Sequence, residues 1–365
     1  MWWLLQHDLP RTTSHVGWYF HHGGDQNLYF QVAQDILAGQ PRPQTASTGW
    51  SFVLAGLLKF IGGDEYTDIL PLVVIGCGVW LGLLSVAVMA RLALQLTDSR
   101  GQALAVAAVW TLLPYLLWFG FAAHPQAEVL RNAYVPRQMW MTGITDGSSL
   151  LFAAWGALCV FQKHSTRRRA MIGCFLGGLS LGWAMALRIQ VLPIVAVALI
   201  AMGWSRQWLG VGVMAVGVIT GFAPQGWYAA ASTGHPLNLP YFVEWLWFDR
   251  DGRMTLLLNN LPANPTSLFE NLFAWARRLP ALVIVAVAGA GAAAGAFVSR
   301  WRQNSAAAIF MYGAPLGSFM LHVITYIYKI DPLRYTLPAV SIGLPAAAWT
   351  ASWMTAKIYR RWSRR

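Results

Sequence analysis

Residues 171–204 read MIGCFLGGLSLGWAMALRIQVLPIVAVALIAMGW and contain a single charged side chain, Arg188. A helix that crosses a bilayer needs roughly 20 mostly apolar residues. The stretch therefore predicts two membrane-embedded helices, 171–187 and 190–204, which are interrupted at Arg188. Because both are short, they form either a tight helical hairpin or a pair in which one or both members are re-entrant.

The composition of the whole chain has the same character. Hydrophobic residues make up 56% of the 365 residues and charged residues only 11%, whereas charged residues form about 25% of an average globular protein. The 20 Trp and 34 Gly fit a bilayer protein, in which indoles lie at the headgroup level and glycines let helices approach closely. These features predict a polytopic membrane protein, and they exclude a soluble enzyme, a soluble nucleic-acid binder and a disulfide scaffold.

Seven further apolar segments are suited to membrane helices. They lie at 69–95, 102–121, 147–162, 207–226, 279–298, 306–328 and 336–355. Together with the first pair they predict an all-α fold: a polytopic transmembrane helical bundle of about nine spans over residues 69–355.

Short basic segments between the apolar runs carry much of the net charge of +12. They contain Lys163, Arg167, Arg168 and Arg169; Arg300 and Arg302; and Lys357, Arg360, Arg361, Arg364 and Arg365. Loops rich in Lys and Arg stay in the cytoplasm, so we place these segments inside, with 356–365 as a basic cytoplasmic tail. This clustering argues against nucleic acid as a partner.

The resulting topology puts four segments outside: residues 1–68, 122–146, 227–278 and 329–335. Of the 14 acidic residues, only Asp98 remains on the cytoplasmic side. Polar chemistry is therefore expected on one face of the membrane, which is the periplasmic face if the protein lies in a bacterial inner membrane.

The first exterior segment has a helical pattern. Between residues 28 and 37, apolar side chains recur at helical spacing while Gln31, Gln34 and Asp35 occupy the other face. This predicts an amphipathic helix along the membrane surface. Residues 50–61 are apolar but too short to span comfortably, so they predict a second interfacial or partly inserted helix.

Several short motifs follow one another along the chain. They are Gly24-Asp25-Gln26-Asn27-Leu28-Tyr29, Gly49-Trp50, Leu187-Arg188-Ile189 with Pro193, Pro224 to Tyr228, and Arg334-Tyr335-Thr336-Leu337-Pro338. In this order they resemble the glycosyltransferase C superfamily, in particular the branch of the protein O-mannosyltransferases and the bacterial aminoarabinose transferase. Members normally open with a membrane helix, whereas this chain starts in the first exterior loop. They often carry an acidic pair in that loop, whereas Gln26 follows Asp25 here.

The resemblance implies an integral-membrane glycosyltransferase. Its donor would be a polyprenyl-phosphate-linked sugar, and its acceptor a lipid, a protein or a polysaccharide at the exterior face. Such transfer needs a base that takes the acceptor's proton and donors that stabilise the phosphate charge. Two alternatives stay open: a transporter or flippase of lipid-linked saccharides, and a saccharide polymerase or ligase of similar layout.

Two carboxylates are candidates for the base. Asp25 is the first choice, with helix N-capping as an equally weighted alternative. Asp146 would complete the acidic pair, although capping of the helix that follows is its more ordinary role.

The substrate-binding candidates are mostly cationic. Arg334 at the mouth of the last helix can bind a lipid phosphate in bidentate fashion, with snorkelling or an ion pair with Asp331 as the alternative. Arg188 interrupts two apolar runs, and an ionisable residue there is by default a functional hypothesis, with a structural salt bridge as competitor. The remaining candidates are Tyr29, His124, Arg131, Arg137, Lys329 and Tyr335.

No cofactor is required by these motifs. The adjacent His21 and His22 with Asp25 are residue types that ligate divalent cations, but no further ligand spacing accompanies them. We therefore assign no metal site from the sequence, and a bound divalent cation stays an open alternative.

Overall fold

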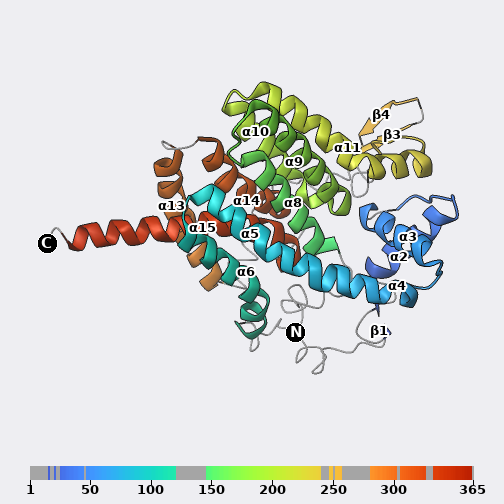
Figure 1. Ribbon diagram of the computed structural model, residues 1–365, viewed down its shortest axis with the longest axis horizontal. Helices are drawn as coiled ribbons and strands as arrows, with labels where there is room; N and C mark the ends of the chain where they lie inside the picture. The colour runs from blue at the N-terminus through green and yellow to red at the C-terminus, as the bar shows by residue number, and fades with distance from the viewer. Residues whose placement is uncertain are drawn as a thin grey trace.

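The structure is a computed structural model in which most of the described residues are helical (Figure 1). It describes residues 15–16, 20–21, 25–44, 47–120, 145–239, 246–249, 251–256, 280–301, 305–325 and 332–363. Two short antiparallel ladders accompany the helices: β1 (His15–Val16) with β2 (Phe20–His21), and β3 (Leu246–Phe248) with β4 (Met254–Leu256). The predicted all-α class is confirmed.

Helices α2 (Asp25–Leu37) and α3 (Gly49–Ile61) form the first segment. The two helices expected near residues 28–37 and 50–61 are thus present. Helix α2 starts three residues before the expected point, because Asp25, Gln26 and Asn27 add no apolar signal yet suit a first helical turn. Its exposed face carries Gln31 and Gln34, as expected.

The buried faces of these two helices share one hydrophobic cluster. It contains Tyr29, Phe30 and Ala33 of α2, Trp50, Leu54 and Leu58 of α3, and Tyr66 and Leu187 from further along the chain. The rings of Phe30 and Tyr66 meet edge to face with centroids 5.6 Å apart. The first segment therefore packs against the bundle through its own apolar stripe.

Three consecutive elements form one uninterrupted helical run, Tyr66–Thr97. They are α4 (Tyr66–Val73), the π-helical η1 (Val74–Leu81) and α5 (Gly82–Thr97). Asp98 ends the run in the left-handed region with φ 55°, and α6 (Arg100–Gly120) then reverses direction. The span expected at 69–95 is thus longer than the sequence pattern indicated.

Helices α8 (Thr145–Phe161), α9 (Arg167–Leu187) and α11 (Trp208–Thr233) pack side by side through glycines. A Cβ added at Gly182 would overlap Val218 O, and one at Gly221 would overlap Leu179 O. Close backbone approach at small residues is the usual means of helix association in bilayers.

The stretch around Arg188 is not a tight hairpin. After α9 come Arg188, the short η3 (Ile189–Val191) and α10 (Leu192–Trp204). Helix α10 packs chiefly on α14 (Ser305–Thr325), and Gly313 of α14 faces Val197. Since α10 turns away from α9, the break at Arg188 separates two helices with different neighbours.

Two helix ends differ from the expected ones. Helix α11 continues through Pro224 to Thr233, so the loop expected from residue 227 starts later. Helix α15 (Pro332–Trp362) begins before residue 336 and runs through most of the expected tail 356–365. Helix α13 (Pro280–Trp301) lies close to its expected position.

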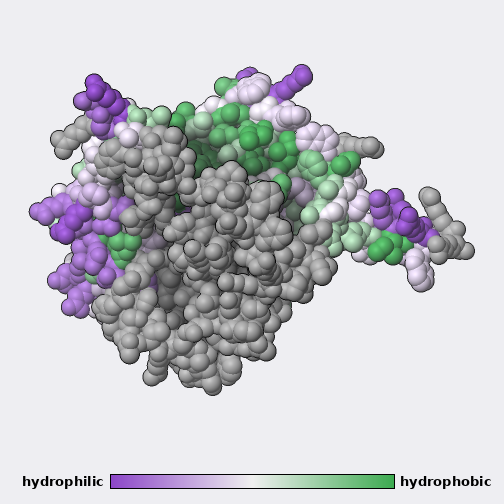
Figure 2. Space-filling model, turned by 180° about the vertical axis from the view of Figure 1, so that it is seen from behind, coloured by the Kyte–Doolittle hydropathy of each residue, from purple (hydrophilic) through white to green (hydrophobic). Residues whose placement is uncertain are grey.

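Three helical runs are long and apolar enough to cross a membrane: Tyr66–Thr97, Arg167–Leu187 and Trp208–Thr233. Shorter apolar helices occur at Gly49–Ile61, Gly147–Phe161, Ile189–Trp204 and Ala306–Met320. Figure 2 shows hydrophobic residues over the upper part of one face, with hydrophilic residues at its left and right margins. These features are consistent with a membrane protein.

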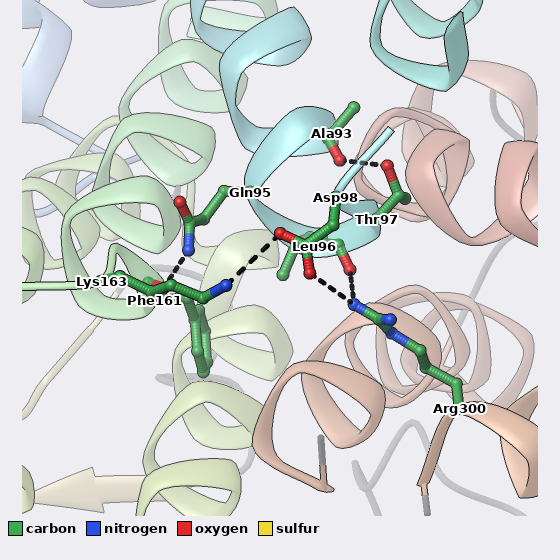
Figure 3. Close-up of polar contacts among 8 residues, drawn as sticks. All are labelled: Ala93, Gln95, Leu96, Thr97, Asp98, Phe161, Lys163 and Arg300. Carbon is green, nitrogen blue, oxygen red and sulfur yellow. Dashed lines mark hydrogen bonds and ion pairs between the residues drawn. The ribbon is translucent and has the colours of Figure 1, made fainter. Parts of the chain in front are cut away.

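One end of the bundle holds a charged cluster (Figure 3). Asp98 lies 3.5 Å from Lys163 and 3.8 Å from Arg300. The Arg300 side chain is only 7% exposed, and its Nη2 donates to Leu96 O at 2.6 Å. Arg300 thus caps the carbonyl end of α5, where a cation is favoured by the helix dipole.

Candidate functional site

The candidate site lies at the end of α9, level with Gln225 in the C-terminal part of α11. Residues 40–44 and 47–48, which connect α2 to α3, pass over the two helices at this level, and we call them the strap. Ser47 Oγ accepts a hydrogen bond from Ile189 N at 3.2 Å. Thr48 donates to Gln225 Oε1 through its backbone N, at 2.7 Å, and through its hydroxyl, at 3.0 Å. All three bonds are buried, so the strap is fixed to α11 and to η3, which directly follows α9.

A second anchor holds the strap one turn further along α11. The Tyr228 hydroxyl donates to Arg42 O at 2.9 Å and accepts from Arg42 N at 3.2 Å. Arg42 Nε also lies 3.5 Å from Asp35 Oδ1 of α2. Because the Arg42 side chain is 71% exposed, this ion pair adds little stability, and Tyr228 is the stronger anchor.

Arg188 lies beneath the strap at the end of α9. Its backbone is extended, with φ −155° and ψ 111°, and its N–H still donates to Ala184 O. The residue is 5% exposed. Gly49 at the start of α3 lies so close that an added Cβ would be 2.6 Å from Ala186 O. The predicted cation is therefore enclosed between α9, η3 and the first segment.

The packing of α8 on α9 places Asp146 at the same level. Ser180 Oγ donates to Phe152 O at 2.7 Å, and a Cβ at Gly177 would lie 2.7 Å from Gly156 O. Both contacts belong to one antiparallel register, which puts Arg188 level with the first turn of α8. That turn begins at Thr145 and includes Asp146.

The start of α15 lies further out at the same end. A Cβ at Gly317 of α14 would be 3.5 Å from Pro193, and one at Gly343 of α15 would be 3.3 Å from Pro315. This places the beginning of α10 near Ser341. Arg334 and Tyr335 are in the first turn of α15, before Ser341. At ~1.5 Å per residue, they lie about 10 Å further out along the axis of α15 than the beginning of α10.

The first segment brings two more candidates to this end. Asp25 is the first residue of α2. Tyr29, one turn later, is 5% exposed and belongs to the cluster that contains Leu187, the neighbour of Arg188. Tyr29 is thus a packing residue of the first segment as well as a candidate.

Four predicted site residues lie outside the described part of the chain: His124, Arg131, Arg137 and Lys329. For metal binding, the described residues contain no group of three or more His, Cys, Asp or Glu side chains that could hold an ion.

The strap anchors were missed by the sequence reasoning. Gln225 is 2% exposed and Tyr228 is also buried. The available signal was Gln225 itself, since it is the one carboxamide in the apolar run of α11. A buried amide needs hydrogen-bond partners, but the sequence does not say that they come from residue 48.

Comparisons with protein-family models, with curated proteins and with solved structures found no match for this chain.

Proposed function

We propose that the protein is an integral-membrane glycosyltransferase that moves a sugar from a polyprenyl-phosphate donor to an acceptor at the exterior face. The observation that carries this proposal is Arg188, a cation enclosed at the end of α9 and level with the first turn of α8. A guanidinium in such a site strengthens electrostatic stabilisation of a phosphate leaving group. The strap is bonded next to this cation, through Ser47 to Ile189 and through Thr48 to Gln225.

In this proposal the residues divide the chemistry between them. Asp25 takes the proton of the acceptor hydroxyl or amine, and Asp146 is the second carboxylate. Arg188 binds the single phosphate that links the sugar to the polyprenyl chain and leaves with that chain, and Arg334 and Lys329 add positive charge for the same phosphate. A positioned base supplies a factor of about 10²–10⁴ in rate, and charge stabilisation a comparable or larger one.

The membrane placement proposed with it has about nine spans. The three long apolar helices would be joined by α6, α8, α10, α13, α14 and α15. The Asp98–Lys163–Arg300 end would face the cytoplasm and the strap the periplasm of a bacterial inner membrane. Support comes from the basic segments, which lie at the helix ends opposite to the strap.

A flippase or transporter of lipid-linked saccharides is the second candidate. The feature that favours it is the broken helix at residues 188–191, since interrupted helices form many transporter sites. The same break also suits an enzyme whose lipid substrate enters from the side.

The test uses the full chain in lipid nanodiscs with a panel of polyprenyl-phosphate sugars and measures acceptor-dependent release of the carrier. Release is expected for the intact chain, and Arg188→Gln and Asp25→Asn are expected to lower it at least about 10²-fold. Asn caps a helix nearly as well as Asp, so Asp25→Asn should leave folding unchanged.

The matched control is Arg168→Gln, at the exposed opposite end of α9, which should keep full activity. Absence of carrier release from every donor, together with movement of labelled lipid-linked saccharide across proteoliposomes, would overturn the enzyme proposal in favour of the flippase. Wild-type release from Arg188→Gln would remove Arg188 from the proposed site.

A further inference from the structure

Gln190 lies in the middle of η3, the short helix that joins α9 to α10. Its Oε1 atom is buried and accepts no hydrogen bond from any residue in the described part of the chain. The backbone around it is well bonded. Ile189 N donates to Ser47 Oγ at 3.2 Å, and Val191 N donates to Arg188 O at 3.1 Å. The unsatisfied acceptor therefore lies in a turn that is itself held in place by hydrogen bonds.

An acceptor in this state costs the folded protein free energy. Buried polar atoms are nearly always hydrogen-bonded, and a buried atom that loses its bond to water without replacement is destabilising. Other buried polar groups of this chain follow the rule: Thr97 Oγ1 donates to Ala93 O at 2.6 Å, for example. The exception at Gln190 is explained if a ligand supplies the missing hydrogen bond.

Three other described side chains also hold a buried oxygen without a hydrogen-bond partner: Ser51, Gln102 and Ser318. Ser51 and Ser318 are 0% exposed, so a ligand does not reach them. Gln102 is half-buried, but it lies in the first turn of α6, at the end of the bundle that holds Asp98. Within the described chain, Gln190 is thus the accessible member of this group at the candidate site.

The neighbour of Gln190 in the site is Arg188, two residues earlier, which is 5% exposed. A guanidinium carries only donors, whereas a carboxamide oxygen carries only acceptor sites. An ionised phosphate offers acceptors and suits Arg188, but it cannot satisfy Gln190 Oε1. The hydroxyl groups of a sugar can. The two residues therefore match the two parts of a lipid-phosphate sugar.

The carboxamide can turn toward a ligand without a change in the backbone. The last side-chain torsion of Gln is soft, and Gln190 is half-buried, so part of its side chain is reachable. The η3 helix also contacts α8 and α15, which carry Asp146 and Arg334 in their first turns. Gln190 thus lies between the elements that hold the other candidates.

We propose that Gln190 binds a hydroxyl group of the sugar in the lipid-phosphate donor, with Oε1 as the acceptor. The inference rests on the proposed function for the identity of that donor. The bound sugar supplies the hydrogen bond that Oε1 lacks in the free protein. Gln190 is then a determinant of sugar recognition, while Arg188 recognises the phosphate.

The first measurement is thermal unfolding of the full chain in phosphatidylcholine nanodiscs without ligand. Methionine is similar to glutamine in length and has no amide, so Gln190→Met should unfold about 1–3 °C above wild type. The matched control is Gln95→Met, because Gln95 Nε2 donates to Phe161 O at 3.0 Å. Loss of that bond should lower the unfolding temperature of the control.

The second measurement is binding of two kinds of lipid, followed by the rise in unfolding temperature that each produces. They are the panel of polyprenyl-phosphate sugars and polyprenyl phosphate without a sugar. Gln190→Met should bind the sugar-bearing lipid about tenfold more weakly and the bare lipid phosphate unchanged. Arg188→Gln should weaken binding of both, and Gln95→Met of neither.

Gln190→Met that binds both lipids like wild type, or loses both equally, would overturn the proposal. A ligand-free Gln190→Met that unfolds below wild type would also overturn it, because Gln190 would then stabilise the free protein. Wild type that is stabilised by no sugar-bearing lipid would contradict it as well. A loss selective for the sugar, without carrier release from any donor, would support this inference and overturn the enzymatic proposal alone.

Discussion

At the scale of single residues, Gln225 holds the strap through one oxygen that accepts two hydrogen bonds from Thr48. Gln225→Leu keeps the volume and removes both bonds. We expect amide exchange of residues 47–48 to become roughly 30-fold faster, since two buried hydrogen bonds of about 1 kcal/mol each are lost. Hydrogen–deuterium exchange with mass spectrometry measures this.

Thr48→Val is the matched control for this substitution. It removes only the hydroxyl's bond and leaves the backbone N–H bonded to Gln225, so its effect should be smaller. An unchanged exchange rate in Gln225→Leu would mean that Tyr228 and Ser47 alone hold the strap.

Asp98 offers a comparison between two cations that differ in burial. The Arg300 side chain is 7% exposed and Lys163 is 76% exposed. Arg300→Met should lower the free energy of unfolding by about 2 kcal/mol, because the hydrogen bond from a charged donor to Leu96 O is lost. Lys163→Met should change it by less than about 0.5 kcal/mol, as for other exposed pairs.

Thermal unfolding in detergent, followed by circular dichroism, compares the two variants. Equal unfolding midpoints of the two variants would show that Arg300 stabilises the protein no more than an exposed ion pair does. Another contact would then stabilise this end of the bundle.

At the scale of helices, the glycine contacts between α9 and α11 control how closely the two backbones approach. Gly182→Ala would place a methyl group against Val218 O, and the helices must then separate. Overpacking of this kind costs about 1–3 kcal/mol. We expect a lower apparent melting temperature and faster exchange at the strap, because its anchors on the two helices move apart.

Gly212→Ala on α11 is the control, since an added Cβ there would have no atom within 4 Å. It should leave the melting temperature unchanged or slightly raised. A comparable loss in both variants would contradict the role of close packing at Gly182.

Which helices exist could be predicted from apolar runs, but several of their ends could not. Helix α11 passes through Pro224 and continues to Thr233, although a proline often ends a helix. Helix α15 continues past the apolar run because Lys and Arg are good helix formers. The direction of α10 depends on Gly313 and Gly317 of α14, which lie too far along the sequence for a local pattern to reveal.

At the scale of the whole molecule, charge is separated between the two ends of the bundle. The proposed orientation predicts that a membrane-impermeant amine reagent labels Lys59 from the periplasmic side of spheroplasts. Lys163 and Lys357 should be labelled only in inverted vesicles. All three lysines are exposed on the protein surface.

Labelling of Lys59 only in inverted vesicles would reverse the topology and remove the proposed exterior site. Labelling of Lys163 and Lys59 from the same side would instead contradict the number of spans between them.

Only part of the candidate site could be predicted from the sequence. Arg188 stood out as the one charge in a long apolar stretch, and its burial follows from that position. The level of Asp146 relative to Arg188 depends on the antiparallel register set by Gly156 and Gly177. Gln225 and Tyr228 bond to residues far away along the chain, and such pairings are fixed only by the packed bundle.

The strap also has a consequence for biosynthesis. Ser47 and Thr48 bond to partners that follow them by 142 and 177 residues. At roughly 5–20 residues per second, Gln225 emerges from the ribosome roughly 10–35 s after Thr48. During that time the strap has no partner for Thr48, so its final structure forms only after α11 has been synthesised.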